Sequence, residues 1–266
     1  MPPAVLDRVS IQNLLRDFEE VGQHLIEHPK TGMLMVLIPA GKFLTDTGYG
    51  ALYEVDLPAY YVGVQPVTNK QYARFLVKTR HHKPESSAQY KTKSAWDDRA
   101  FGPENPNHPV VDVSWDDAAA YCGWAGLRLP TKQKWEKAAR GLDGRDFPWG
   151  KYWDSDRCRN DSNKSVETTA GVWRYGKGGS PFGALQLSGN VWEWCDDGVA
   201  RGGSWKAPPP PPPRAFYGDP WANGRRHLAP VPVVLEIKDF SGRVDCLRPA
   251  ADSCGFRCVG EVGVPP

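Results

Sequence analysis

Six cysteines, at positions 122, 158, 195, 246, 254 and 258, are the first candidates for chemistry in this sequence. None belongs to a Cys-x-x-Cys pair, and none is spaced with histidine in the way that zinc ligands usually are. The simplest interpretation is that they are buried free thiols of a protein in a reducing compartment. Their spacing alone therefore predicts no metal site.

Other residues that could do chemistry do not form a recognised catalytic pattern either. The sequence shows no two-histidine, one-carboxylate spacing for non-haem iron, no Ser/His/Asp arrangement and no phosphate-binding glycine loop. His24 and His28 are four residues apart and could share a metal on a helix, but no third ligand is suggested nearby. The segment GKGGSPFG, residues 176–183, lacks the Walker spacing and indicates a turn-rich loop.

Aromatic and charged residues gather after the segment RGGSW, which ends at Trp205. Such side chains are frequent in binding hot spots, because they offer large contact areas and directed hydrogen bonds. Six prolines at 208–213 favour a stiff polyproline II segment, and VPVVLEIKDF at 231–240 predicts an inserted strand. We therefore expect a displayed surface over residues 206–254, although some of its side chains could instead pack the domain. The candidate ligand-binding residues are Arg214, Phe216, Tyr217, Asp219, Trp221, Asn223, Arg225, Arg226, His227, Asp245, Arg248, Asp252 and Ser253.

Composition and charge are those of an ordinary globular chain. Of its 266 residues, 40% are hydrophobic and 24% are charged, which is enough to bury a core. The net charge of +2 comes from 33 basic and 31 acidic residues spread along the chain, so no nucleic-acid partner is expected. We find no apolar run long enough for membrane insertion and no signal-peptide pattern. These features predict a cytoplasmic location.

The first thirty residues predict one amphipathic helix. Ser10 can cap it, and apolar residues recur three and four apart from Ile11 to Leu25. Because this apolar stripe must be buried, we expect residues 1–32 to be a helical extension packed on a domain of residues 33–266.

Three more helix starts are predicted at Thr68, Ser114 and Thr131, whose side chains suit an N-cap. Gly126 and Gly141 suit the ends of the last two helices. Apolar runs such as MLMVLIPAGKFL and YEVDLPAYYVGVQPVT predict strands, and helical periodicity is lost beyond about residue 142. The 27 glycines, 25 prolines and 11 tryptophans add many turns held by aromatic side chains. The sequence therefore predicts an α+β domain with little regular secondary structure, helices early and irregular β-structure late.

Six segments follow one another along the chain: MVLIPAGKF, YYVGVQPVTNKQYARFL, HPVVDVSWDDAAAYCGWAGLRLPTKQKWEKAARG, SGNVWEW, RGGSW and GFRCV. In this order and spacing they resemble the formylglycine-generating enzyme family, also called sulfatase-modifying factors. The resemblance covers roughly residues 33–259. It implies a single domain with the formylglycine-generating-enzyme-type variant of the C-type lectin fold.

The resemblance also implies an oxidase activity. Family members convert a substrate cysteine to formylglycine with oxygen and copper, through two cysteines placed a few residues beyond the Gly-Gly-Ser motif. Copper(I) needs such soft thiolate ligands. Here the positions after Trp205 are Lys206, Ala207 and the prolines at 208–213, so a copper cofactor is not expected. A rearranged pair of Cys246 and Cys254 is the alternative.

A cysteine pair and a calcium site follow from the same resemblance. In secreted members the cysteines of the AYC and GFRC segments form a disulfide, which implies that Cys122 and Cys258 lie close together, bonded or not according to the compartment. Members also bind calcium at the GN-x-W-E segment. This makes candidate oxygen ligands of Asn160, Asp161, Gly189, Val191 and Glu193. The alternative is that Asn190 and Glu193 hydrogen-bond loop backbone while the neighbouring tryptophans fill the core.

The interval between GGSW and GFR also resembles the ligand-facing region of the variable proteins of diversity-generating retroelements. Those proteins use this fold to bind other molecules without catalysis, although they lack such a proline run and inserted strand. The sequence therefore favours a non-catalytic display protein, of cellular, phage or prophage origin, that binds a protein or another macromolecule. The alternatives are an oxygen-dependent formylglycine-generating oxidase or related sulfatase-modifying enzyme, and a structural protein that docks a partner through the N-terminal helix.

Overall fold

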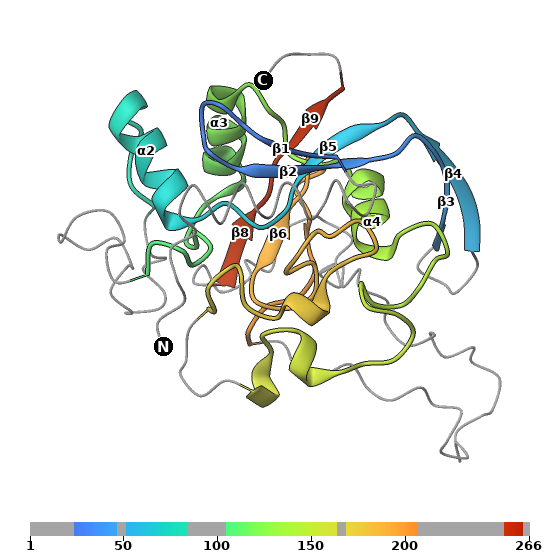
Figure 1. Ribbon diagram of the computed structural model, residues 1–266. Coiled ribbons are helices and arrows are strands. Elements are labelled where there is room, and N and C mark those ends of the chain that lie inside the picture. Colours follow the sequence, from blue (N-terminus) through green and yellow to red (C-terminus); the bar gives the residue numbers. More distant parts are fainter. Residues whose placement is uncertain (1–23, 47–51, 85–104, 164–168, 207–252, 263–266) are drawn as a thin grey trace, which may run out of the picture.

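The fold is given by a computed structural model that describes residues 24–46, 52–84, 105–163, 169–206 and 253–262 (Figure 1). No helix within these ranges is long and apolar enough to cross a membrane. The helix expected from residue 11, as far as residue 23, and the greater part of the expected displayed surface, residues 207–252, lie outside the described ranges.

A four-stranded antiparallel sheet joins the two ends of the described chain. Its order is β1 (Leu25–Glu27), β2 (Leu34–Ile38), β5 (Tyr60–Gly63) and β9 (Val259–Glu261). The runs of Leu, Val, Ile and Tyr in β2 and β5 suit a sheet that is covered by other elements. The last strand, β9, thus pairs with the early strand β5, so this sheet holds the C-terminal part of the described chain against its N-terminal part.

The predicted helix is wrong at its C-terminal end, because Leu25 begins strand β1 and pairs with Val36 of β2. Gly32, with φ at +67°, provides the tight turn between the two strands. His28, which the sequence places on the same helix face as His24, is instead buried in this turn, with Nδ1 3.0 Å from the Thr31 hydroxyl. Residues 25–32 therefore belong to the sheet.

The predicted strands of the segment MLMVLIPAGKFL do not pair with each other. After β2, the chain turns away and β3 (Gly41–Asp46) forms an antiparallel hairpin with β4 (Leu52–Leu57). A third sheet has the order β7 (Ala200–Arg201), β6 (Trp192–Trp194) and β8 (Cys254–Phe256). In it β6 runs antiparallel to β7 and parallel to β8.

Three α-helices begin directly after the residues predicted to cap them: α2 (Asn69–Thr79), α3 (Trp115–Ala125) and α4 (Lys132–Arg140). In each case the cap side chain accepts a hydrogen bond from the backbone N–H three residues later, which satisfies a donor that the helix itself leaves unpaired. Gly126 ends α3 in the left-handed conformation.

Beyond α4, the helices of the described chain are three short 3-10 turns: η1 (Ser155–Arg157), η2 (Asp161–Asn163) and η3 (Gly176–Gly178). The described part thus mixes few helices with several small sheets. The α-helices fall in the middle of the chain, with strands on both sides.

An aromatic cluster joins α2, α3 and β8. Tyr72 stacks on Tyr121 with ring centroids 5.7 Å apart, and Phe256 meets Tyr121 edge-on at 5.3 Å. Such offset and edge-on pairs add to the stability gained from burial. This cluster holds the two helices against the third sheet, which carries the ends of the expected displayed surface.

Candidate functional site

The segments SGNVWEW and RGGSW are joined by backbone hydrogen bonds. The Gly189 N–H donates to the Gly202 carbonyl at 2.8 Å, and the Trp205 N–H donates to the Asn190 carbonyl at 2.9 Å. Gly189 has φ at +74°, and a Cβ there would lie 2.3 Å from the Arg159 carbonyl oxygen, so a side chain does not fit. The chain therefore leaves the scaffold after Trp205 from a fixed point.

The third sheet anchors both ends of residues 206–254. Strand β7 precedes this interval and β8 ends it, and the two strands flank β6 on opposite sides; β6 and β8 lie side by side in Figure 1. The sheet is tied to α3 at two points. The indole N–H of Trp194 donates to the Val113 carbonyl at 3.0 Å, and that of Trp115 donates to the Cys195 carbonyl at 2.8 Å. We call β6, β7, β8 and the segment 188–191 the frame.

An ion pair lies at the centre of the frame between Glu193 of β6 and Arg257, which follows β8 directly. Both side chains are fully buried, and the guanidinium Nε and Nη2 donate to the two carboxylate oxygens at 2.5 and 2.6 Å. The indole N–H of Trp135 adds a 2.7 Å hydrogen bond to Oε2. Nη1 of Arg257 donates to the Gly63 carbonyl at 2.9 Å. Since both charges are paired in a bidentate geometry, the desolvation cost of burying them is offset.

This arrangement does not fit the calcium site that the resemblance implies. Calcium takes six to eight oxygen ligands, usually including carboxylates. The Glu193 carboxylate is already bound on both oxygens by a permanently charged guanidinium, so in this arrangement it does not fit the role of a calcium ligand.

The other predicted calcium ligands differ in burial and in their hydrogen bonds. Asn160 is buried and uses its amide locally, with Oδ1 accepting from the Ser162 N–H at 2.9 Å, while Asp161 is exposed on η2. Val191 is buried, and the Gly189 carbonyl accepts from the Val191 N–H at 2.9 Å. The expected alternative holds for Asn190, whose side chain pairs with the Ala170 backbone at 2.8 and 3.0 Å.

The five cysteines within the described ranges are all buried. The Sγ atoms of Cys122 and Cys258 lie 3.1 Å apart, as their implied pairing requires. Burial raises the pKa of the Cys122 and Cys195 thiols well above the ordinary range, and raises that of Cys158 to about 12. A copper ligand or a nucleophile must be a thiolate, so these pKa shifts work against both roles.

Most predicted ligand-binding residues, those numbered 214–252, lie outside the described ranges, but the two ends of the interval are described. Lys206 is exposed, and its ammonium lies 4.8 Å from the centre of the Trp205 ring. Ser253 is only 2% exposed, so its predicted role as a surface contact is wrong. It directly precedes the buried strand β8, which sets the end of any displayed surface before it.

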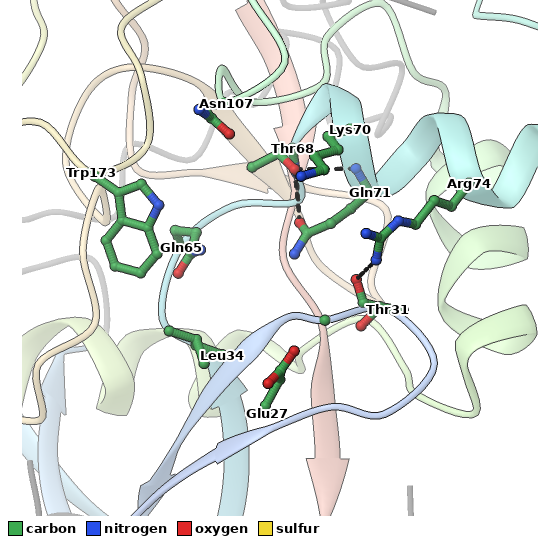
Figure 2. A pocket seen from close by; sticks show the side chains of 11 residues that line it. Glu27, Thr31, Leu34, Gln65, Thr68, Lys70, Gln71, Arg74, Asn107 and Trp173 are labelled. Atoms are coloured by element: carbon green, nitrogen blue, oxygen red, sulfur yellow. Dashed lines mark hydrogen bonds between the residues drawn. The ribbon is translucent and has the colours of Figure 1, made fainter. Parts of the chain in front are cut away.

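A polar pocket of about 160 Å³ lies between the β1–β2 turn and the start of α2 (Figure 2). Glu27, Lys70 and Arg74 bring charges of both signs to its wall, and Trp173 adds an aromatic face. No sequence motif predicts this pocket, although the spacing of Lys70 and Arg74 places them on one face of a helix. Its volume suits a small polar molecule and is too small for a macromolecular contact.

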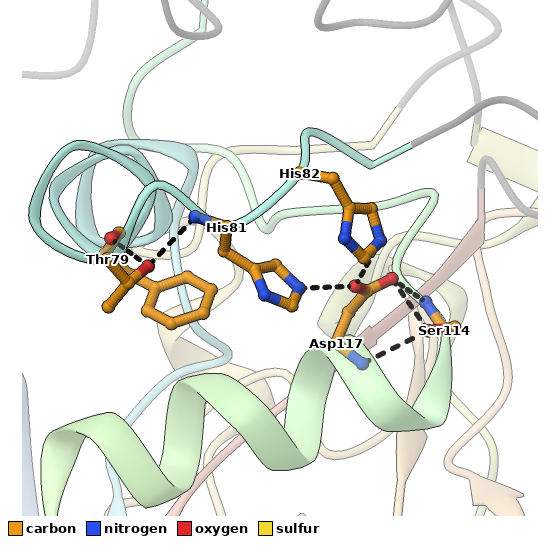
Figure 3. A network of polar contacts seen from close by, with 6 residues as sticks. Thr79, His81, His82, Ser114 and Asp117 are labelled. Carbon is orange, nitrogen blue, oxygen red and sulfur yellow. Dashed lines mark hydrogen bonds and ion pairs between the residues drawn. The ribbon is translucent and has the colours of Figure 1, made fainter.

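The structure also brings together two histidines and a carboxylate that the sequence analysis did not connect (Figure 3). His81 and His82 follow α2, and both direct Nε2 at Oδ1 of Asp117 in the first turn of α3, at 2.7 and 3.0 Å. The sequence shows no two-histidine, one-carboxylate spacing, and the set forms only in the folded chain. Asp117 lies 36 residues after His81 and 35 after His82, so sequence spacing could not reveal that the three side chains meet.

Comparison with known proteins gives consistent matches. Residues 23–262 match the family described as "Sulfatase-modifying factor enzyme 1-like domain". "Inactive C-alpha-formylglycine-generating enzyme 2" of Bos taurus is 30% identical over 291 residues, covering 87% of this chain and 89% of that protein. "Formylglycine-generating enzyme" of Streptomyces coelicolor is 34% identical over 225 residues, covering 64% of this chain and 70% of that one.

Two solved structures share the fold. "Structure of PvdO from Pseudomonas aeruginosa" aligns at a TM-score of 0.57 with 20% identity, over 90% of this chain and 98% of that one. "Treponema denticola variable protein 1" aligns at 0.57 with 19% identity, over 90% and 99%. At these identities the likeness is one of fold.

Proposed function

Because this chain belongs to the sulfatase-modifying factor enzyme 1-like domain family, we propose that it is a non-catalytic ligand-binding protein built on the scaffold of that family. The matches to inactive formylglycine-generating enzyme 2 from Bos taurus and Mus musculus, each 30% identical, are consistent with a family in which the scaffold is used without the activity. In this proposal the scaffold is the formylglycine-generating-enzyme-type variant of the C-type lectin fold.

One observation carries the proposal: the chain that leaves the frame has no thiol where the enzyme would need two. The backbone is held as far as Trp205 by the hydrogen bond from its N–H to the Asn190 carbonyl, which fixes the point at which the following segment begins. That segment starts with Lys206, Ala207 and six prolines. Neither an ammonium nor a proline can replace a thiolate on copper(I). The expected oxidase chemistry therefore lacks its ligands at this position.

The binding site in this proposal is the interval 206–252, which the frame presents. Its two ends meet the same small sheet, which would let a long insertion vary without disturbing the core. Arginine and aromatic residues such as Arg214, Trp221 and Arg226 suit contacts with a protein or another macromolecule. The fold likeness to a variable protein from Treponema denticola supports a display role of the retroelement type.

The activity test is direct. The purified chain is incubated with copper(I), oxygen and a cysteine-containing sulfatase peptide, with the Streptomyces coelicolor enzyme as positive control. We expect no aldehyde on the peptide by mass spectrometry and no stoichiometric copper(I) binding in competition with a chelator. Aldehyde formation by this chain, at a rate comparable to the control, would refute the proposal.

The display role has its own test in sibling copies from the same source. If the interval is diversified, copies will differ mainly between residues 206 and 252 while SGNVWEW and RGGSW stay unchanged. An invariant interval would remove the retroelement hypothesis and leave a binding protein for one fixed ligand.

A further inference from the structure

We propose that His81, His82 and Asp117 bind one divalent transition-metal ion of the zinc type. The two imidazole Nε2 atoms and one carboxylate oxygen lie within 4.8 Å of one another. Imidazole nitrogen with one carboxylate oxygen suits zinc, cobalt and nickel, and three protein ligands leave a fourth position for water. The site lies after the end of α2 and in the first turn of α3, and none of its three ligands belongs to the frame.

The distances require only a small adjustment. Zinc holds nitrogen and oxygen ligands at about 2.0–2.2 Å, so neighbouring ligand atoms of a tetrahedral site lie about 3.3 Å apart. Oδ1 of Asp117 is now 2.7 Å from Nε2 of His81 and 3.0 Å from that of His82. Oδ1 must therefore move away from the two nitrogens by about half an ångström, and the two nitrogens, which lie within 4.8 Å of each other, must come to the same spacing. His82 can make that movement because its side chain is 64% exposed.

Neighbouring groups already orient the ligands. Oδ2 of Asp117 accepts hydrogen bonds from the Ser114 N–H at 2.9 Å and the Ser114 hydroxyl at 2.7 Å, which directs Oδ1 toward the histidines (Figure 3). The His81 ring packs against Phe75 with centroids 4.9 Å apart, and its backbone N–H donates to the Thr79 hydroxyl at 3.2 Å. Metal ligands are typically held by an outer layer of this kind.

The arrangement of the two imidazoles suits a metal as well as hydrogen bonds. Their rings lie 4.3 Å apart and aim at one oxygen, so as hydrogen-bond donors both would need a proton on Nε2. A metal ion instead uses both Nε2 lone pairs and binds the carboxylate directly. The positive end of the α3 dipole lowers the affinity for a cation by about two- to fivefold. The three bonds from the ligands to the ion contribute more than this loss. Exposed Asp116 in the same turn adds a compensating charge.

A bound ion would join the chain that follows α2 to the first turn of α3. These elements already share the aromatic contacts of Tyr72 and Tyr121, so the ion would add a second connection at their polar end. Because it binds the folded chain, it would also raise the melting temperature, and the rise would grow with the logarithm of the ion concentration above the Kd.

The test is a titration of the metal-free full-length chain with Zn²⁺ by calorimetry and with Co²⁺ by visible absorbance. We expect one ion per chain with a Kd of about 1 µM or lower, and a Co²⁺ spectrum of nitrogen and oxygen ligands. His82→Ala should weaken binding at least about 100-fold, since loss of a ligand costs no less than loss of an outer partner. His24→Ala removes an exposed histidine outside the set and should leave the affinity unchanged.

Three results would overturn the proposal. The first is a wild-type chain that takes up no ion at a tenfold molar excess. The second is binding that survives both His82→Ala and Asp117→Asn, and the third is a Co²⁺ spectrum with thiolate charge-transfer bands, because in both cases the ion lies elsewhere. His82→Ala is the main variant, because the exposed His82 side chain contributes little to the stability of the fold. Asp117→Asn retains a side-chain oxygen that can accept the hydrogen bond from Ser114.

Discussion

The carboxylates of Glu193 and Asp117 are both largely withdrawn from solvent, and each could be expected to hold a metal. In the frame, both oxygens of Glu193 are bound by the Arg257 guanidinium, which is always charged and cannot become a ligand. At the α2–α3 end, one oxygen of Asp117 faces two imidazoles, which can bind a proton or a metal. The partner of a buried carboxylate, more than its position in a motif, therefore decides whether the carboxylate can bind a metal.

The largest effect should come from breaking the frame's ion pair. Glu193→Gln leaves the Arg257 charge buried and unpaired, which costs about 3–5 kcal/mol of unfolding free energy. Urea unfolding measures it. The matched control is Glu54→Gln, which breaks the exposed Lys42–Glu54 pair at 3.0 Å and should cost much less. Equal losses in the two variants would mean that the frame is not held by its ion pair.

The next effect concerns the close packing of the frame. Gly189→Ala forces a Cβ to within 2.3 Å of the Arg159 carbonyl at a positive φ, so we expect a loss of about 2–4 kcal/mol. Gly123→Ala, in α3, meets nothing within 4 Å and should stabilise the chain by about 0.5–1 kcal/mol. Thermal unfolding of both variants checks the contrast. A neutral Gly189→Ala would show that the frame can relax.

A smaller effect separates the two roles of Ser114. Ser114→Ala should cost about 1 kcal/mol through loss of the α3 cap and should also weaken Zn²⁺ binding about tenfold, because Asp117 loses a partner. Thr131→Ala removes the cap of α4 and should cost the same stability with no change in Zn²⁺ affinity. Urea unfolding and calorimetry on each variant decide it. If both variants bind Zn²⁺ as the wild type does, Ser114 is only a cap.

The smallest effect is a pH dependence that arises outside the Asp117 cluster. Burial, with the nearby Arg159 and Arg174 charges, lowers the pKa of His108 below its ordinary value of 6.5. The unfolded chain therefore binds more protons than the folded one as pH falls through 6.5, and stability decreases in that direction. His108→Asn should flatten the stability curve between pH 7.5 and 5.5, measured by urea unfolding. An unchanged slope would mean that His108 is not protonated on unfolding.

Local features of the fold were predictable from sequence. The caps at Thr68, Ser114 and Thr131 depend on residues three apart, and the helices begin where those side chains require. The sites were less predictable because they depend on distant contacts. Glu193 meets Arg257 across 64 residues, and no spacing rule links them. The resemblance to a family drew attention to the GN-x-W-E segment. It could not show that the Arg257 guanidinium donates hydrogen bonds to both oxygens of the Glu193 carboxylate in that segment.

The same limit applied at the N-terminal side, where apolar spacing continued the predicted helix through Leu25. Pairing with β2 instead makes this residue part of a strand, since a sheet partner overrides the local pattern. His81 and Asp117 likewise meet only because tertiary packing brings the C-terminal end of α2 close in space to the N-terminal end of α3.

The comparison between the two carboxylates is tested most directly by anomalous diffraction from crystals of the full chain equilibrated with Co²⁺. The account predicts one strong anomalous peak between Nε2 of His81, Nε2 of His82 and Oδ1 of Asp117, with no peak beside Glu193 or after Ser204. A peak at Glu193 or at the residues that follow Ser204, with none at Asp117, would contradict it.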